Sequence, residues 1–328
     1  MKTKRATFAY RCPVTLSALL LLAACSIPLP PGGSREATPS VLQPPSRSIA
    51  TQPAEQAAAT AHPLATEAAL QILSNGGSPI DAAIAAQMVL GLVEPQSSGI
   101  GGGTLIMNYD AASGKLTSYD GLAAAPAKVT AALTIDVDGK NQKSDDVQRG
   151  GRSVGVPGTL AVLKDVHVRY GRLPWSALFE PAILLAERDF PMPRYMHNIL
   201  ATPTAAAEHP DLLPLFFGTD GKVLPIGTNI TNPEYAATMK RIAMRGPAGL
   251  WEEGSGAKLI AAAQRGAHHP LMTEADLAAY RAYPREPLCR PFLAHTVCAM
   301  GPTSFGGSNS KFKKCPQASM PKCPPYRV

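Results

Sequence analysis

The sequence predicts an α+β domain in which helices cover a hairpin of short strands. Two strand patterns, 104–109 and 115–119, are separated by the turn-forming segment 110–114, and helical patterns lie before and after them. Of the 328 residues, 45% are hydrophobic, which is enough for a real core. Strands grouped early and helices grouped later favour a layered α+β domain over a doubly wound parallel sheet.

Two helices are expected before the strand pair. The first covers 62–75 and has an apolar face. Ser78 can cap the second, Pro79 suits its first turn, and Asp81 completes a capping-box spacing. Residues 80–90 of this second helix are apolar almost all round, so we expect it to be buried in the core.

A glycine run joins the second helix to the first strand. Residues 97–103 read Ser-Ser-Gly-Ile-Gly-Gly-Gly, and Gly99, Gly101, Gly102 and Gly103 let the backbone approach another backbone or a ligand closely. A dinucleotide-binding loop follows a strand and opens a helix, whereas this run follows a helix and opens a strand. The order of elements therefore argues against a nucleotide fold and favours a structural glycine loop.

Further helices are expected after the strand pair, over 158–170, 176–189, 233–245, 255–265 and 274–282. Asn232, followed by Pro233, begins one of them. Thr273 and Asp276 repeat the capping-box spacing in another. The sequence has no internal repeat, which is consistent with one layered body.

The N-terminus has the pattern of a secretory signal, with four basic residues, no acidic residue and the apolar run 14–22. This run is too short to span a bilayer comfortably. Leu-Ala-Ala-Cys at 22–25 resembles a bacterial lipobox, which predicts a lipoprotein signal peptide over 1–24 and lipidation of Cys25. Ser26 favours the outer membrane. An ordinary signal peptide with an incidental Cys25 is the alternative.

Residues 25–56 are expected to be a flexible tether between membrane and domain. Seven prolines lie between 27 and 53 among Ser, Thr, Gln and Gly, a composition that cannot bury enough apolar surface to fold. Together with the signal this predicts a protein of the periplasm, lipid-anchored to the bacterial cell envelope.

The net charge of +7 does not indicate nucleic-acid binding. Nine of the 31 Lys and Arg lie in the two ends, 1–24 and 308–328, which contain no acidic residue, so the body is close to neutral. A nucleic-acid-binding domain concentrates basic charge on its folded part. The composition therefore predicts no nucleic-acid partner.

The six cysteines do not make a disulfide framework. Cys12 lies within the expected signal, and Cys289 and Cys298 could pair in an oxidising compartment, although their spacing does not require it. His268 and His269 have no nearby set of ligands, so the sequence predicts neither a metal site nor a cofactor.

Short motifs follow one another along the body of the chain. Besides the glycine run they are His62-Pro63, Asn75-Gly76-Gly77, Gly155-Val156-Pro157-Gly158-Thr159, Tyr170-Gly171-Arg172-Leu173-Pro174-Trp175, Asn232-Pro233-Glu234-Tyr235-Ala236-Ala237-Thr238, Leu271-Met272-Thr273-Glu274-Ala275-Asp276-Leu277-Ala278-Ala279-Tyr280 and Met300-Gly301-Pro302-Thr303-Ser304-Phe305-Gly306-Gly307. The ordered set spans 57–307 and resembles the large subunit of γ-glutamyltransferases, also called glutathione hydrolases.

This resemblance implies an N-terminal nucleophile hydrolase, a four-layer αββα sandwich built from a large and a small subunit that are cut from one precursor. In that family the N-terminal threonine of the small subunit attacks the γ-glutamyl amide of glutathione or a related amide, with its own α-amine as base. The threonine normally lies in a Thr-Thr-His-containing segment, and no Thr-Thr-His occurs here. We therefore expect a truncated large-subunit portion, an incomplete sandwich without a small subunit, no catalytic residue and no activity of this chain alone.

A second departure concerns substrate binding. The family holds the substrate's α-carboxylate with an arginine in an Asp-Gly-Arg-Glu-x-Ala-Pro segment, and this chain has Leu122 at the arginine and Ala123 at the glutamate. Leucine offers no donor to a carboxylate, whereas arginine makes a bidentate pair. Loss of such a contact in a buried site costs about 2 to 5 kcal/mol. Arg152 is a weak substitute, because a surface-loop role suits it better.

The third departure is the tail, 308–328, which has five basic residues and no periodicity. A frameshift or premature truncation after Gly307 explains it more simply than a designed end. Two alternatives stay open: a non-catalytic periplasmic lipoprotein that binds a ligand on the same scaffold, and a fragment of an acylase-like relative with a more apolar acyl pocket.

Other candidate groups are weaker. Ser97 and Ser98 lie beside the glycines, but no Gly-x-Ser-x-Gly elbow is present. The acidic residues Glu180, Glu187 and Asp189 on one helical stretch are interpreted as a solvated face.

Overall fold

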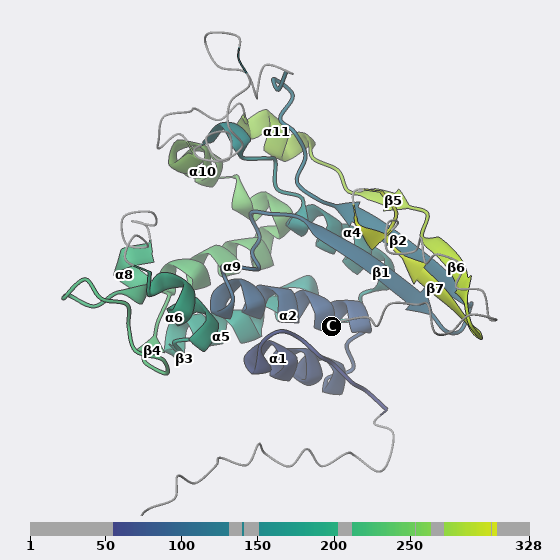
Figure 1. Cartoon of the computed structure of the whole chain (residues 1–328), viewed down its shortest axis with the longest axis horizontal. Coiled ribbons are helices and arrows are strands. Elements are labelled where there is room, and N and C mark those ends of the chain that lie inside the picture. The colour runs from purple at the N-terminus through teal and green to yellow at the C-terminus, as the bar shows by residue number, and fades with distance from the viewer. Residues whose placement is uncertain are drawn as a thin grey trace, which may run out of the picture. The chain divides into compact units, whose positions relative to one another are not determined.

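The computed structural model describes residues 55–130, 140, 151–202, 212–252, 254–263, 272–302 and 304–306 (Figure 1). Its α-helices are α1 (Pro63–Ser74), α2 (Pro79–Val93), α4 (Thr159–Tyr170), α5 (Glu180–Arg188), α6 (Arg194–Leu200), α8 (Leu213–Phe216), α9 (Pro233–Arg245), α10 (Ser255–Ala263) and α11 (Glu274–Ala279). Its strands are β1 (Thr104–Asp110), β2 (Lys115–Gly121), β3 (Phe190–Pro191), β4 (Asn229–Ile230), β5 (Tyr283–Arg285), β6 (Leu288–Phe292) and β7 (His295–Ala299). The expected signal, most of the expected tether, Cys25, the pair His268 and His269, Gly307 and the tail lie outside the described residues.

The two expected N-terminal helices are confirmed as α1 and α2, which pack on each other. Both halves of the predicted capping box form at the start of α2, since Ser78 Oγ accepts from the Asp81 amide and the Asp81 carboxylate accepts from the Ser78 amide. Most of α2 is buried, as its composition predicts, although Ala83 remains exposed. His62 caps α1 through Nδ1, which accepts from the Leu64 amide at 3.3 Å.

The fully buried carboxylate of Asp81 ties α2 to the segment after α4. Its Oδ2 also accepts from the backbone amides of Arg172 and Leu173, at 2.8 and 3.1 Å. Its Oδ1 lies 3.7 Å from Nε2 of His167 on α4. Backbone donors to a carboxylate satisfy a charge that would otherwise be costly to bury. Asp81 therefore fixes both the start of α2 and the entry to the next helical segment.

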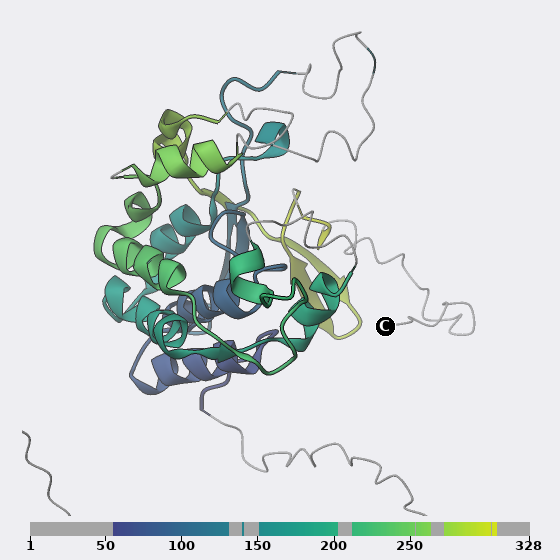
Figure 2. The ribbon, with the colours of Figure 1, turned by 90° about the vertical axis from the view of Figure 1, so that its left-hand side faces the viewer.

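The predicted hairpin is confirmed as β1 and β2, which pair antiparallel from Thr104 opposite Gly121 to Asp110 opposite Lys115. Asp110 accepts from the Ala112 amide and the Ser113 hydroxyl in the turn, and Gly114 has a positive φ of 65°. The sheet has the order β1-β2-β5, so β1 is an edge strand within the part of the chain that the structure describes. Figure 2 shows most helices gathered on one side of these strands.

The C-terminal helices depart from prediction in two places. The stretch expected as one helix over 176–189 is a 3₁₀ segment, Trp175–Phe179, followed by α5. The helix expected over 274–282 ends at Ala279, because Tyr280 turns out of helical geometry at ψ 137°. The helices expected over 158–170 and 233–245 are confirmed by α4 and α9, and α10 confirms the described part of 255–265.

A single main core joins α1, α2, α4, α5 and α9. Its largest fully buried side chains include Phe179, Phe190, Phe216, Ile84 and Met88. The indole of Trp175 donates to the Ile242 carbonyl at 3.0 Å and so satisfies its one donor within the core. The layered α+β prediction is therefore confirmed.

The sequence did not predict the strands β3 to β7. The pair β6–β7 forms a separate hairpin in which Cys289 and Cys298 lie opposite each other and are joined by a disulfide. At its tip Leu293 has a φ of 51°, which is uncommon for a residue other than glycine. None of the described helices is both long and apolar enough to cross a bilayer.

Candidate functional site

The glycine run forms a loop between α2 and β1, as predicted. The amides of Ser97 and Ser98 donate to the Glu94 carbonyl at 3.0 and 2.9 Å, which turns the chain away from the helix. The Gln87 side-chain amide donates to Ser98 Oγ at 2.7 Å and holds the loop against α2. The loop and its neighbours line a hollow of about 450 Å³, which has no acidic side chain in its wall.

The loop ends in a close approach of two backbones. A methyl group added to Gly103 would lie 2.5 Å from the Cα of Leu122 and 2.6 Å from the amide nitrogen of Ala123. Non-bonded carbon atoms separated by 2.5 Å overlap strongly, so only glycine fits without movement of the backbone. The glycine loop is therefore in direct contact with residue 122, the position at which the family resemblance implies a carboxylate-binding arginine.

Leu122 is half-buried and its backbone is held from two sides. Its amide donates to Asp120 Oδ1 at 3.0 Å, and its carbonyl accepts from the hydroxyl of Tyr280 at 2.6 Å. Tyr280 follows α11, so the hydrogen bond joins residues 158 positions apart in the chain. These two bonds position the segment that carries residue 122 without using its side chain.

The start of α4 closes the same site. The amides of Gly158 and Thr159 donate to the Gly102 carbonyl at 2.9 and 3.3 Å, and Thr104 Oγ1 donates to Thr159 Oγ1 at 3.1 Å. A methyl group on Gly158 would lie 2.2 Å from the Tyr280 hydroxyl. Four motifs that are distant in sequence therefore meet around Leu122.

Asp120 and Arg285 place an ion pair beside this segment. Nε and Nη2 of Arg285 on β5 lie 3.2 Å from Oδ2 of the nearly buried Asp120, and Ser118 Oγ donates to the Arg285 carbonyl at 2.6 Å. The guanidinium is engaged by Asp120, and the Leu122 amide binds the other carboxylate oxygen. Burial raises the pKa of Tyr280 above its usual value of 10.0, and the negative charges of Asp120 and of ionised Tyr283 raise it further.

Sequence reasoning did not assign Tyr280 or Arg285 to the site. Tyr280 is the last residue of the motif that contains Thr273 and Asp276. Its hydrogen-bond partner, Leu122, is 158 residues away, and the sequence gives no signal of that pairing. Arg285 reaches the site through the pairing of β5 with β2, in which Asp120 lies opposite Tyr283. Arg152 lies in the short 3₁₀ turn Gly151–Ser153, and its side chain is outside the described part of the structure.

The weaker candidates remain weak in the structure. No hydrogen bond joins Ser97 or Ser98 to a histidine within the described ranges. Glu180, Glu187 and Asp189 are exposed, and Glu187 pairs with Lys240 of α9, as expected for a solvated face. The residues that the structure describes contain no cluster of three or more His, Cys, Asp or Glu able to hold a metal ion.

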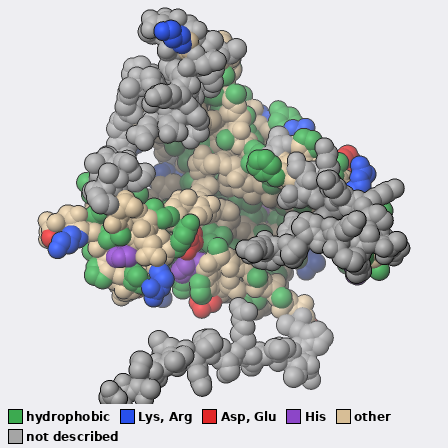
Figure 3. Space-filling model, in the orientation of Figure 1, with side chains coloured by type: hydrophobic (Ala, Val, Ile, Leu, Met, Phe, Trp, Pro, Cys, Tyr) green, Lys and Arg blue, Asp and Glu red, His purple; other side chains and the backbone are tan. Residues whose placement is uncertain are grey.

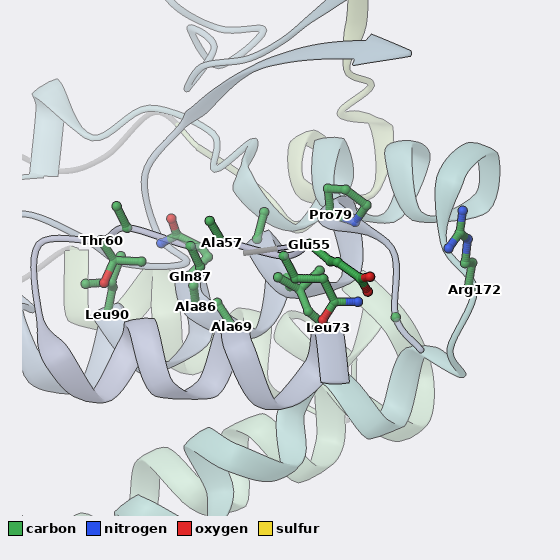
Figure 4. A pocket seen from close by; sticks show the side chains of 16 residues that line it. Glu55, Ala57, Thr60, Ala69, Leu73, Pro79, Ala86, Gln87, Leu90 and Arg172 are labelled. Carbon is green, nitrogen blue, oxygen red and sulfur yellow. The ribbon is translucent and has the colours of Figure 1, made fainter. Parts of the chain in front are cut away.

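A larger hollow of about 710 Å³ lies between α1, α2 and residues 55–60 (Figure 4). Small apolar side chains such as Ala69, Ala86 and Leu90 form much of its wall, with Glu55 and Arg172 also lining it. Gln87 lines both hollows, whereas Gly103, Gly158 and Tyr280 do not line the larger one. On the face in Figure 3, acidic and basic side chains are scattered singly and do not form a patch of one sign.

Helices packed on an antiparallel sheet, with a glycine loop closing over the end of β2, are consistent with part of the scaffold of the N-terminal nucleophile hydrolases. Residues 65–311 match the sequence model of the γ-glutamyltranspeptidase family. The chain belongs to this family.

Individual relatives support the same assignment. The chain is 32% identical over 241 residues to glutathione hydrolase 3 of Arabidopsis thaliana, covering 74% of this chain and 37% of that protein. It is 36% identical over 254 residues to the acylase ACY 1 proenzyme of Pseudomonas sp. strain SE83, covering 76% and 45%. The crystal structure of Helicobacter pylori γ-glutamyltranspeptidase superposes with a TM-score of 0.72 at 27% identity, covering 79% of this chain and 73% of that one. The chain therefore spans less than half of the length of these two curated relatives.

We predict that Gly103→Ala displaces the loop from the Leu122 segment, because its new methyl group overlaps backbone atoms that cannot rotate away. Overpacking of this kind costs roughly 1 to 3 kcal/mol of unfolding free energy. Gly101→Ala is the matched control, since no atom lies within 4 Å of its added methyl group. Denaturant unfolding of both variants measures the difference, and equal stabilities would contradict the close approach.

Tyr280→Phe should lose the bond to the Leu122 carbonyl and lower the unfolding free energy by about 0.5 to 1.5 kcal/mol at neutral pH. The folded protein holds this proton more tightly than the unfolded chain, because the pKa is raised. The stabilisation is therefore fully present below pH 10.0 and is lost as pH rises through the raised pKa. Unfolding curves at neutral and alkaline pH should show the gap between wild type and variant closing, and a gap that widens would exclude this role.

Proposed function

We propose that this chain supplies the large-subunit scaffold of an enzyme that cleaves and transfers acyl groups from γ-glutamyl amides, glutathione among them. The observation that carries the proposal is the meeting of four family motifs around Leu122, where Gly103, Gly158 and Tyr280 fix one backbone segment. The family match over 65–311 and relatives named glutathione hydrolase support the same reaction class.

The nucleophile in this proposal comes from a small subunit. The 328 residues contain no Thr-Thr-His, the sequence in which the family's N-terminal threonine lies. In the proposed reaction the threonine oxygen bonds to the γ-carbonyl carbon, its proton passes to the threonine's own amine, and the amide nitrogen leaves with a proton. Water or an amino acid then takes the acyl group. The described residues would position the substrate, since the glycine loop, β2 and α4 would hold the acyl group beside residue 122.

A second candidate substrate class is an acyl amide without an α-carboxylate. Leu122 supplies no donor, and the nearby Arg285 is already paired with Asp120. A free carboxylate at this position would therefore lack the charged partner that is worth about 2 to 5 kcal/mol. The acylase relative, at 36% identity, supports this candidate.

We predict that the purified chain alone releases nothing from a γ-glutamyl anilide, because it holds no activated nucleophile. Co-expressed with a small subunit of the family, it should hydrolyse 4-aminobutyryl anilide at least as well as γ-glutamyl anilide, since the two acyl groups differ only in the α-carboxylate. Leu122→Arg should then favour the γ-glutamyl substrate by about 30-fold or more in kcat/KM, the equivalent of 2 kcal/mol.

Leu122→Met is the matched control, because it keeps an apolar side chain of similar volume and should leave the ratio unchanged. Turnover by the chain alone would contradict the need for a second subunit. A folded two-subunit complex that cleaves neither anilide would favour the non-catalytic binding lipoprotein instead.

We further propose that the protein is a periplasmic lipoprotein anchored through Cys25. The basic N-terminus, the apolar run 14–22 and the lipobox-like Leu-Ala-Ala-Cys support this. The disulfide of the described region is also typical of an oxidising compartment. Bacterial cells fed labelled palmitate should label the wild type and Cys12→Ser but not Cys25→Ser, and label retained in Cys25→Ser would exclude the anchor.

A further inference from the structure

The hairpin β6–β7 carries a disulfide that the proposed acyl transfer does not use. The strands β6 and β7 lie side by side in Figure 1. Cys289 on β6 and Cys298 on β7 are directly opposed in the antiparallel register and covalently joined. The two halves differ in access, since Cys289 is exposed and Cys298 is half-buried. A thiol arriving from solvent therefore meets the sulfur of Cys289 first.

The disulfide has a clear structural task. Among the residues that the structure describes, β6 and β7 pair only with each other, as a two-stranded sheet. An isolated two-stranded hairpin is marginally stable in water, so its register depends on what else holds it. The bond between Cys289 and Cys298 joins the second of the five residue pairs, near the open end of the hairpin, and fixes the flanking pairs of Leu288 with Ala299 and of Arg290 with Val297. Breaking it would release the hairpin's main constraint.

The charge around Cys289 suits an anionic thiol. The neighbouring Arg290 is exposed, and its Nη1 donates to the Cys289 carbonyl at 3.4 Å, which places a guanidinium beside the backbone of Cys289. His295 is exposed on the facing strand, neither strand of the hairpin contains Asp or Glu, and the acidic residue next in sequence is the exposed Glu286, three positions before Cys289. A cation near the reacting sulfurs attracts an anionic thiol and stabilises a departing thiolate.

We propose that the Cys289–Cys298 disulfide is a thiol-exchange site that accepts a small anionic thiol, of the glutathione type, on Cys289. The thiolate sulfur bonds to Cys289 Sγ, the Sγ–Sγ bond breaks, and its electron pair goes to Cys298 Sγ, which takes up a proton. A second thiol molecule then attacks the mixed disulfide and leaves Cys289 reduced. In total two small thiols lose two electrons to form their own disulfide, and the protein disulfide gains them.

Thiol exchange at Cys289 can affect the candidate site, because a short stretch of chain joins the hairpin to β5. β6 begins three residues after Arg285, the last residue of β5, whose guanidinium pairs with Asp120. Asp120 in turn accepts from the Leu122 amide. An unlocked hairpin removes a constraint immediately next to that pair. The proposal does not require that the chain take part in γ-glutamyl chemistry.

The test uses the oxidised full chain in which the other four cysteines, Cys12, Cys25, Cys315 and Cys323, are replaced by serine. The chain is incubated with reduced glutathione or with the neutral thiol 2-mercaptoethanol, quenched in acid and mapped by peptide mass spectrometry. The expected result is an adduct on Cys289 with a free thiol on Cys298. An adduct predominantly on Cys298, or an intact disulfide after exposure to both thiols, would overturn the assignment.

The variant Arg290→Gln distinguishes an electrostatic effect of the guanidinium on thiol exchange from a structural effect of residue 290. It should slow exchange with glutathione by about fivefold at low salt and leave exchange with 2-mercaptoethanol unchanged, because only the first thiol is anionic. Equal slowing with both thiols would exclude the electrostatic role.

Amide hydrogen exchange tests directly whether the disulfide holds the β6–β7 hairpin together. Amides of 288–299 should exchange faster in the reduced chain than in the oxidised chain, while those of β1 and β2 keep their protection. Unchanged protection of 288–299 after reduction would show that the disulfide does not hold the hairpin.

Discussion

The candidate site depends on three positions at which there is room for a hydrogen atom and nothing larger. A methyl group would lie 2.5 Å from the Leu122 Cα at Gly103, 2.3 Å from Val162 Cγ1 at Gly121, and 2.3 Å from the Gly121 carbonyl oxygen at Gly158. These glycines allow the loop, β2 and the start of α4 to share one volume. The contacts at Gly103 and Gly158 are between backbones and are stiff, because they have no rotamers to adjust, whereas Gly121 meets the side chain of Val162. The geometry around residue 122 is therefore set largely by main-chain contacts, together with the hydrogen bonds that Asp120 and Tyr280 make with the Leu122 backbone.

The buried carboxylate of Asp81 helps to position the glycine loop next to residue 122. It binds the amides of Ser78, Arg172 and Leu173, so one side chain fixes the start of α2 and the segment after α4. α2 then runs through the core and ends where Glu94 turns the chain into the glycine run. Because α4 also presents Gly158 and Thr159 to Gly102, the same two helices position the loop from both of its sides.

Local signals in the sequence were enough for much of this arrangement. Ser78 and Thr273 mark helix starts through capping boxes, and the Asp110 turn marks the hairpin, since each signal acts within a few residues. The sequence did not reveal the pairing of β5 with β2, the Tyr280 bond to Leu122 or the Asp120–Arg285 pair, all of which join residues more than 150 positions apart. The disulfide was left open, because a spacing of nine residues fits many loops and only the antiparallel register makes Cys289 and Cys298 neighbours.

At this site the contacts that fix the backbone are separate from the side chain that would recognise a substrate. Asp120 and Tyr280 hold the Leu122 backbone through its amide and carbonyl, so they would hold any residue other than proline at that position in the same way. An arginine or a leucine side chain can therefore project from the same backbone with little change in the fold. A TM-score of 0.72 at 27% identity is compatible with either one, since a superposition follows the main chain. Under the proposed function the scaffold would position the acyl group and the side chain of residue 122 would select it, so the two questions need separate measurements.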